Sequence, residues 1–484
     1  MTDAGLGNKV FRSLTWVGTA NAISQVLSWA ITIVIVRHLS PGDFGLMAMA
    51  VAFWGFLTMI GDFGLFASIV QSKEVSDSQL REIFGFIIIL NILFFLVTYL
   101  AAPVISGYFA EPRLTPILRT LCIVFIFIPM YIIPHSLLLR EMNFQKISVI
   151  DVLCGLCGAT ASLIFALNGY GVWSLVYGTM MQFFSRALCF SLVATRYYMP
   201  LFRLNEIKGM LSFSGFFTGS TILRYFFFKS DIIIGGRFIG PDALGIYSIA
   251  NQLAFTPVEK MSYIIPQVAF PAFSKMQFDV EAYADNFLRG LKLLNLIFIP
   301  CYIVLFVLAE DIIGVLLGPK WGTVVVPMRI LCLIMPLRAF EVLFIPAMNG
   351  LGKSNITMLT SGLSLAVMAC AFLVGMGWGY IGLCWAWVGG FTIIYAIMIG
   401  MCVKNFQMRI ADIAQTYITS LISSAGLLIM GVMLMYNHQV MINPILKIMA
   451  YLTASILLFA ASLFLVDRPI ITYLKGLMTS AKSA

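Results

Sequence analysis

The chain has 484 residues and a formal net charge of +9, with 61% hydrophobic and 11% charged residues. Soluble domains carry about 25% charged residues, so this composition excludes a soluble protein. The basic residues are spread over many short loops rather than gathered in one patch, and the positive charge therefore does not indicate a nucleic-acid partner.

Apolar runs of about 20 residues, long enough to cross a hydrocarbon core about 30 Å thick, follow one another along the chain. They predict an all-α integral membrane protein with about fourteen transmembrane helices. The expected spans are 14–36, 43–66, 83–106, 117–139, 147–168, 171–194, 209–228, 242–268, 287–308, 324–348, 355–378, 380–403, 415–436 and 444–466. The first run is too long for a signal-peptide core and lacks a convincing cleavage site, so we expect it to be a retained span.

The spans group into halves. We predict an N-lobe of helices 1–6 at residues 1–204 and a C-lobe of helices 7–12 at 205–405. Two additional transmembrane helices and a cytoplasmic tail are expected at 406–484. With the amino end inside, the predicted cytoplasmic loops hold most of the Lys and Arg residues, which indicates that both termini are cytoplasmic. The bases on the opposite side are Arg37, Arg113, Lys229, Arg237 and Lys320.

A ten-residue turn occurs twice in the chain. The sequence RHLSPGDFGL at 37–46 reappears as RFIGPDALGI at 237–246, with Arg, Pro and Gly in register. The Ser or Gly before each proline is expected at a helix N-cap, and the proline at the first helical position, where its missing N–H costs nothing. Because an even number of predicted spans separates the copies, we expect two parallel six-helix lobes that point the same way across the membrane.

The cysteines lie inside apolar stretches, which implies no disulfide framework. Cys154 and Cys157 have the spacing of a metal-binding pair, but no second Cys or His pair follows at zinc-site distance, so we predict no metal site.

Several motifs resemble one known family. They are the RxLSPxxFG turn at 37–45, GDFGL at 61–65 with IVQ at 69–71, LREMNF at 139–144, DIIIGGRFIG at 231–240 and LGIY at 244–247. With these motifs the chain resembles, over nearly its whole length, the polysaccharide transporter or Wzx-type flippase family of the multidrug/oligosaccharidyl-lipid/polysaccharide (MOP) superfamily. The branch of colanic-acid-exporter-like and lipopolysaccharide biosynthesis proteins is the most similar.

The resemblance implies a MATE-like fold and a flippase that moves an undecaprenyl-pyrophosphate-linked oligosaccharide from the cytoplasmic to the periplasmic leaflet by alternating access. Exopolysaccharide or lipopolysaccharide biosynthesis is the implied pathway, and the bacterial inner membrane is the implied location. No cofactor is implied, and Na⁺ or H⁺ is the candidate coupling ion. The implied partners are the lipid-linked substrate, membrane lipids, and polymerase and chain-length proteins of the pathway.

Charged residues inside predicted spans supply the candidate binding site. An Arg, Lys or Asp at a helix centre costs about 2.5–3.5 kcal/mol in lipid, so most such groups should face an interior cavity or lie near an interface. We predict that embedded bases bind the pyrophosphate, since an Arg guanidinium can donate two parallel hydrogen bonds to phosphate oxygens. These bases are Arg186, Arg224, Lys260 and Arg338. The alternative is pairing with embedded acids, which are Asp62, Asp151, Glu259 and Glu341.

Two further features are open to more than one interpretation. Asp62 follows Gly61 at a helix end and is either a ligand for a coupling cation or, the interpretation that we favour, a helix cap. Prolines inside spans interrupt backbone hydrogen bonding and are either hinges or static kinks. The candidates are Pro257, Pro300 and Pro336.

Three other functions compete with this prediction. A membrane glycan polymerase is an enzyme that needs a sizeable extramembrane loop, but the longest polar gap, near 274–286, spans about a dozen residues. A cation-coupled multidrug exporter should have a smaller and more acidic cavity. A lipid II flippase would share a cationic cavity, so charge alone does not separate it from the favoured function.

Overall fold

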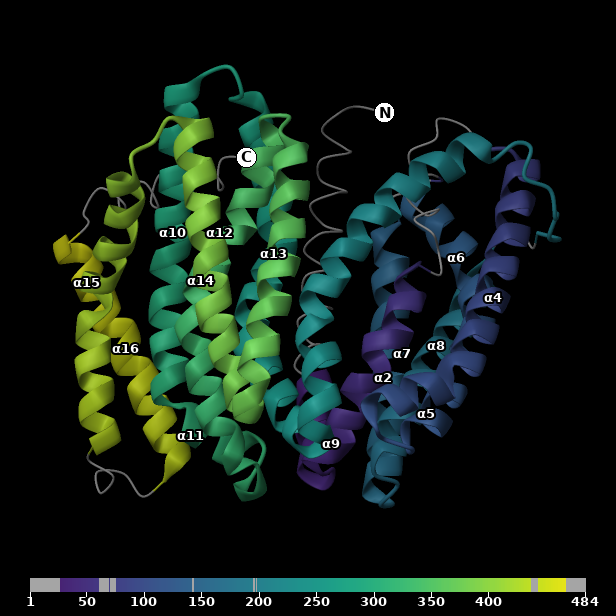
Figure 1. Ribbon diagram of the computed structural model, residues 1–484, viewed down its shortest axis with the longest axis horizontal. Coiled ribbons are helices and arrows are strands. Elements are labelled where there is room, and N and C mark those ends of the chain that lie inside the picture. The colour runs from purple at the N-terminus through teal and green to yellow at the C-terminus, as the bar shows by residue number, and fades with distance from the viewer. Residues whose placement is uncertain are drawn as a thin grey trace. The chain divides into compact units, whose positions relative to one another are not determined.

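The structure is a computed structural model that describes residues 27–60, 69, 75–141, 143–194, 196, 198–436 and 443–466. Within these ranges the side chains of 208–221, 263, 436, 460 and 462–466 are not described. The regular secondary structure of the described residues consists of α-helices and two short 3₁₀ segments, without a strand (Figure 1). This confirms the predicted all-α class.

Contacts divide the chain into two compact units, Met1–Gly245 and Ile246–Ala484. The helices of the first unit are α2 (Pro41–Ile60), α4 (Asp77–Phe109), α5 (Leu114–Leu121), α6 (Val124–Arg140), α7 (Phe144–Leu167) and α8 (Val172–Val193). Helix α9 (Lys208–Lys275) continues from the first unit into the second. The others are α10 (Val280–Val307), α11 (Ala309–Leu316), η1 (Pro319–Val324), α12 (Val325–Gly350), α13 (Ser354–Gly375), η2 (Met376–Trp378), α14 (Gly379–Phe406), α15 (Ile410–Tyr436) and α16 (Pro444–Val466). The predicted lobe boundary at 204/205 stays a prediction.

Within the described residues, nine helical stretches are long and apolar enough to span a membrane. Two of them, Ile222–Lys275 and Ser354–Phe406, contain 54 and 53 residues. At 1.5 Å per residue each is more than twice the length that one crossing needs. The chain is therefore an integral membrane protein, and the count of fourteen spans remains a prediction.

The seventh expected span ends too early. The sequence predicts its end at 228, with Lys229 in the loop that follows, but the helix continues to a break at Gly240, whose φ of 76° and ψ of 171° are not helical. Asp231 is fully buried, and its Oδ1 accepts a hydrogen bond of 2.7 Å from the backbone N–H of Ile232. Burial and hydrogen bonding keep this charged residue inside the helix, which local polarity alone does not reveal.

The repeated turns adopt the predicted caps. Ser40 precedes α2, and its Oγ accepts a bond of 3.3 Å from the Asp43 N–H, while Asp43 Oδ2 accepts one of 2.8 Å from the Ser40 N–H. Pro41 is the first residue of α2. In the second copy Gly240 takes the capping position through its positive φ, a conformation that glycine adopts without strain.

The two copies of the turn cross at their glycines. A methyl group on Gly45 would overlap the carbonyl oxygen of Pro241, and one on Gly245 would overlap that of Pro41. Small residues permit this approach of two helix backbones, in which Cα–H groups can contact carbonyl oxygens. The repeated proline and glycine are therefore explained by one contact, in which each glycine packs on the other copy's proline.

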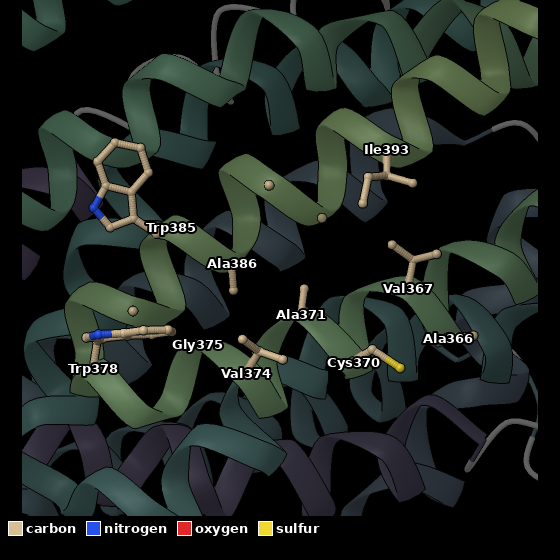
Figure 2. Close-up of a pocket in the computed structure, with 13 residues that line it drawn as sticks. Ala366, Val367, Cys370, Ala371, Val374, Gly375, Trp378, Trp385, Ala386 and Ile393 are labelled. Carbon is tan, nitrogen blue, oxygen red and sulfur yellow. The ribbon is translucent and has the colours of Figure 1, made fainter.

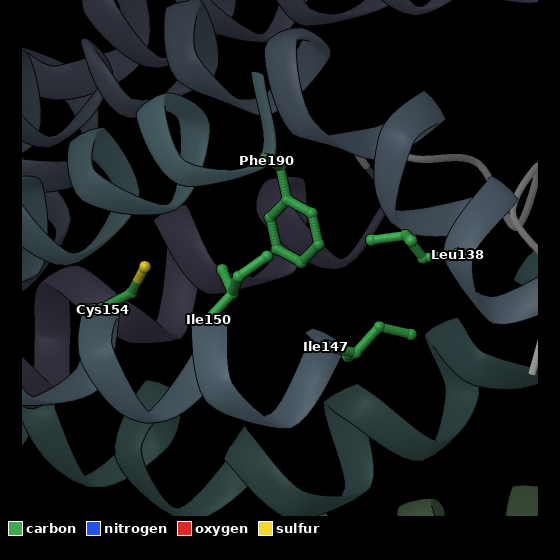
Figure 3. Packing of buried hydrophobic residues seen from close by; sticks show 5 residues of the cluster. All are labelled: Leu138, Ile147, Ile150, Cys154 and Phe190. Carbon is green, nitrogen blue, oxygen red and sulfur yellow. The ribbon is translucent and has the colours of Figure 1, made fainter. Parts of the chain in front are cut away.

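The first unit has an apolar cluster between α6, α7 and α8. It consists of Leu138, Ile147, Ile150, Cys154 and Phe190, all of which are buried (Figure 3). Figure 3 shows the Phe190 ring pointing from α8 toward Ile150 of α7. Because one side chain joins three helices, the cluster fixes their rotation and so determines which way their neighbouring polar groups face.

The turn between α4 and α5 contains an ion pair outside the spans. The Arg113 guanidinium donates to both carboxylate oxygens of Glu111 at 2.8 and 3.0 Å and holds the pKa of that carboxyl below its usual range. This stabilisation is present above the unfolded pKa of about 4.3 and is lost as the pH falls through the lower folded value.

We expect Glu111→Gln to reduce the free energy of unfolding at pH 7 by less than about 1 kcal/mol, because the Arg113 side chain is 63% exposed and solvent screens the pair. Below about pH 3 the difference from the wild type should vanish. Thermal unfolding in detergent between about pH 3 and pH 7 measures the stability difference. Arg113→Gln should have the same effect, and strict additivity of the two substitutions would contradict the assigned pairing.

In the second unit α10, α12 and α14 surround a core of large aromatic residues, and α15 packs on α10 (Figure 1). Helix α16 is joined to α11 by an ion pair of 2.8 Å between Lys447 Nζ and Asp311 Oδ2. Tyr451 of α16 donates a buried hydrogen bond of 2.8 Å to the carbonyl oxygen of Leu427 in α15. Polar contacts thus join α16 to α11 and to α15 within the second unit.

Candidate functional site

The predicted base Arg186 lies beside the predicted acid Asp151. Its Nη2 is 3.1 Å from Asp151 Oδ1, and the two side chains are 29% and 43% exposed. Helix α8 supplies the arginine and α7 the carboxylate. The structure thus brings together one predicted base and one of the acids that the sequence analysis named as its possible partners.

The guanidinium of Arg186 also lies over an aromatic ring. Its Cζ is 4.8 Å from the centroid of Tyr131 and 5.9 Å from that of Phe190. Arg186 precedes Phe190 by one helical turn, so the apolar cluster that fixes Phe190 also orients the arginine. Half-exposed and held on a carboxylate and an aromatic face, this base can bind an anion only in competition with Asp151.

Arg338 is in a different environment, at the centre of the second unit. Only 3% of it is exposed, and its Cζ lies 4.1 Å from the Trp387 centroid and 4.4 Å from that of Phe255. The Trp387 Nε1 donates a bond of 2.6 Å to the hydroxyl of Tyr247, which fixes the indole. A desolvated cation between two rings gains about 2 kcal/mol from the ring quadrupoles, which offsets part of its desolvation.

The other two predicted bases lie on α9. Arg224 and Lys260 are both exposed, and Glu259 precedes Lys260 in the same exposed segment. Glu341 is half-buried on α12, three residues after Arg338, so the two side chains share one face of that helix. Asp62 lies outside the described residues.

The hinge candidates lie within continuous helices. Pro257 is in α9, Pro300 is buried in α10, and Pro336 is half-buried in α12. Each removes one intrahelical hydrogen bond. Whether these prolines act as hinges or kinks stays a prediction.

Sequence reasoning did not identify the aromatic partners of the two arginines. Tyr131 is 55 positions from Arg186, Phe255 is 83 before Arg338 and Trp387 is 49 after it. No local pattern links residues so far apart. Trp387 was visible only as one of several tryptophans, and its pairing depends on how α12 and α14 rotate against each other.

A separate apolar cavity of about 600 Å³ lies between α13 and α14, which run side by side (Figures 1 and 2). Glycines and alanines such as Gly375, Ala371 and Ala386 form its floor, and Trp378 and Trp385 lie at one end. The two indoles are 72% and 52% exposed. With so few polar atoms in its lining, this cavity suits hydrocarbon and does not suit a charged headgroup.

A metal site is also absent from the described residues, since no three of their His, Cys, Asp and Glu side chains are grouped to hold an ion.

The chain matches the family described as "Polysaccharide biosynthesis protein" over residues 34–326, which is more than half of its length. The chain belongs to this family. The matched region includes both copies of the repeated turn, Arg186 and the α9 bases. Membership confirms the predicted polysaccharide transporter family.

Curated relatives of the family extend the match. The chain is 26% identical to lipopolysaccharide biosynthesis protein WzxC of Escherichia coli (strain K12), over 69% of this chain and 68% of that protein. It is 27% identical to succinoglycan biosynthesis transport protein ExoT of Rhizobium meliloti (strain 1021), over 74% of this chain and 72% of the relative. Teichuronic acid biosynthesis protein TuaB of Bacillus subtilis (strain 168) is 26% identical, over 79% of this chain and 80% of that protein.

Solved structures show the same fold. The lipid II flippase MurJ in an inward closed conformation superposes with a TM-score of 0.75 at 13% identity, covering 94% of this chain and 99% of MurJ. An inward-facing MATE multidrug resistance transporter of the MOP superfamily gives a TM-score of 0.58 at 15% identity, covering 80% of this chain and 95% of the transporter. These similarities establish the fold and extend it to nearly the whole chain.

Proposed function

We propose that this protein is a flippase that moves an undecaprenyl-pyrophosphate-linked oligosaccharide from the cytoplasmic to the periplasmic leaflet of a bacterial inner membrane. Membership of the polysaccharide biosynthesis family carries the proposal. The named relatives WzxC, TuaB and ExoT serve lipopolysaccharide, teichuronic acid and succinoglycan biosynthesis, and ExoT is a transport protein. Both termini of the chain lie in the cytoplasm under this proposal.

Embedded bases bind the diphosphate in this mechanism. Arg186 and Arg224 present cationic groups at partly or fully exposed positions, while Arg338 lies buried between aromatic rings. Hydrogen bonds between a guanidinium and phosphate oxygens are about twice as strong as those between neutral groups, and they offset the loss of the headgroup's hydration. Alternating access then exposes the bound headgroup to the second leaflet, and Na⁺ or H⁺ is the proposed coupling ion.

Reconstitution tests the substrate. An undecaprenyl-pyrophosphate-linked oligosaccharide is added on one side of liposomes that contain the purified protein. It should become accessible to a glycosidase on the other side. We expect the Arg186→Gln/Arg224→Gln/Lys260→Gln/Arg338→Gln variant to lose at least about 90% of this rate, because each lost charge-assisted bond removes about 1.5 kcal/mol or more.

A parallel assay with a cationic dye serves as the discriminating control. Dye transport without movement of the glycolipid would contradict the proposal and favour a multidrug exporter. Movement of lipid II in preference to other glycolipids would show that lipid II is the substrate instead. Unchanged glycolipid transport by the fourfold variant would exclude the four substituted residues as the binding groups.

A further inference from the structure

A second cavity, separate from the embedded arginines, lies where α10 and α15 begin. Its volume is about 440 Å³, and it is lined mainly by polar side chains, in contrast to the apolar cavity between α13 and α14. Helix α10 contributes Asp285, Arg289 and Lys292 to the lining. Helix α15 contributes Asp412 together with neutral hydrogen-bonding groups.

The cavity lies at the polar end of two membrane spans. After Lys292 no charged residue follows in α10 as far as Val307, and none follows Asp412 in α15 as far as Tyr436. The last charged residue of a span marks the boundary between headgroups and hydrocarbon. Farther along α15, Ile418 and Ile422 are 54% and 55% exposed, as expected of a surface that contacts acyl chains. The cavity is thus at the level of the lipid headgroups.

The charges of the lining balance: α10 carries two cations and one carboxylate, and α15 carries the second carboxylate. Arg289 and Lys292 are three residues apart on one face of α10, where both can contact a single phosphate. Asp285 lies 3.4 Å from Arg289 on that helix. Asp412 approaches from α15, where its Oδ2 accepts a bond of 3.1 Å from the Arg409 N–H, and its second oxygen can accept another. A purely anionic ligand would meet two carboxylates as well as two cations.

The neutral groups complete the site. Gln415 lines the same cavity, and its side-chain amide can donate hydrogen bonds to ester or phosphate oxygens, whereas the Thr419 hydroxyl donates to the Gln415 carbonyl oxygen at 2.8 Å. Thr416 is 6% exposed, and its hydroxyl oxygen accepts a bond of 3.1 Å from the buried Asn295 side chain. This bond joins α15 to α10 at the cavity and holds Asp412 opposite the charged residues of α10.

We propose that this cavity binds the headgroup of an ethanolamine phospholipid. The phosphate lies between Arg289 and Lys292, and the primary ammonium donates hydrogen bonds to Asp412 and Asp285. A choline headgroup has the same charges but no N–H donors, and a glycerol headgroup has no cation, so the site discriminates among the three. Lipid bound here links α15 to α10, and the site is independent of the flippase mechanism proposed above.

Competition among three lipids with identical acyl chains tests the proposal. Purified protein is incubated with equimolar phosphatidylethanolamine, phosphatidylcholine and phosphatidylglycerol, and native mass spectrometry counts the lipids retained. We expect the ethanolamine lipid to be retained about tenfold over each of the others, the factor that one hydrogen bond to a charged group provides. Equal retention of the three lipids, or preference for phosphatidylglycerol, would overturn the proposal.

Two pairs of substitutions assign the contacts. Asp285→Asn/Asp412→Asn should abolish the preference for ethanolamine over choline, and the amide oxygen introduced at position 412 can still accept the bond from the Arg409 N–H. Arg289→Gln/Lys292→Gln should weaken retention of all three lipids. Lys275→Gln/Glu281→Gln, which alters charges near α10 that do not line the cavity, is the matched control and should behave as wild type. A preference that persists in the double Asn variant would place the lipid elsewhere, and if that variant does not fold, wild-type selectivity alone decides the outcome.

Discussion

We expect Gly245→Ala to lower the free energy of unfolding by about 1–3 kcal/mol or more, the range observed when a methyl group is forced into a packed site. Its Cβ would overlap the carbonyl oxygen of Pro41 and lie 3.1 Å from the backbone nitrogen of Gly45. Backbone atoms at the starts of helices cannot move aside as a flexible side chain does, so the helices must separate. Thermal unfolding in detergent, followed by light scattering and tryptophan fluorescence, measures the effect.

Gly362→Ala in α13 is the matched control, because nothing lies within 4 Å of its added methyl group. Alanine is the better helix former by about 1 kcal/mol, so this variant should be neutral or slightly more stable. Gly45→Ala should resemble Gly245→Ala, since it meets the Pro241 carbonyl in the same way. The double variant should lose less free energy of unfolding than the sum of the two single losses, because one methyl group already separates the helices. Equal stabilities for Gly245→Ala and Gly362→Ala would show that the crossing is not tightly packed.

The repeat illustrates what the sequence can reveal about the fold. Proline at a first helical turn and glycine four residues later have local causes, so the helix starts at Pro41 and after Gly240 were predictable. The partner of each glycine was not, because the two copies are about 200 positions apart. The end of the seventh expected span, at 228, was wrong because a local signal was misleading. The charge of Lys229 indicated a loop, while the helix continues through the buried Asp231 to Gly240.

The candidate site was harder to predict than the spans. Membrane helices are apolar on nearly every side, so hydrophobic periodicity does not indicate which face is interior. The sequence therefore identified Arg186 and Asp151 as embedded charges but could not decide between a free base and a pair. For Arg338 it offered only a base near an acid, and the rings of Phe255 and Trp387 were not foreseen. Spans follow from composition, whereas side-chain partners follow from helix rotation, which packing determines.

Arg338→Met should separate binding from structure. The methionine is shorter than arginine but unbranched and flexible, and its sulfur can contact the rings of Phe255 and Trp387. Replacement of a buried ion by an apolar side chain is often neutral or stabilising. We therefore expect the free energy of unfolding to stay within about 1 kcal/mol of wild type or to rise. Glycolipid transport should fall by about 10- to 100-fold, because a hydrogen bond to a charged group contributes about 1.5–3 kcal/mol.

The control for this substitution lies on the same helix. Arg329 donates from Nε to the Phe306 carbonyl at 3.2 Å, and its Nη2 is 3.7 Å from Glu310, whose side chain is 65% exposed. Arg329→Met should leave transport within about twofold, since a screened pair contributes little. Both variants are compared in the liposome assay and by thermal unfolding. Because Arg338 is covered by its rings, substrate contact requires a state in which Phe255 or Trp387 turns away. Wild-type transport by Arg338→Met would show that the guanidinium serves packing alone and would restrict the proposed binding groups to the exposed bases.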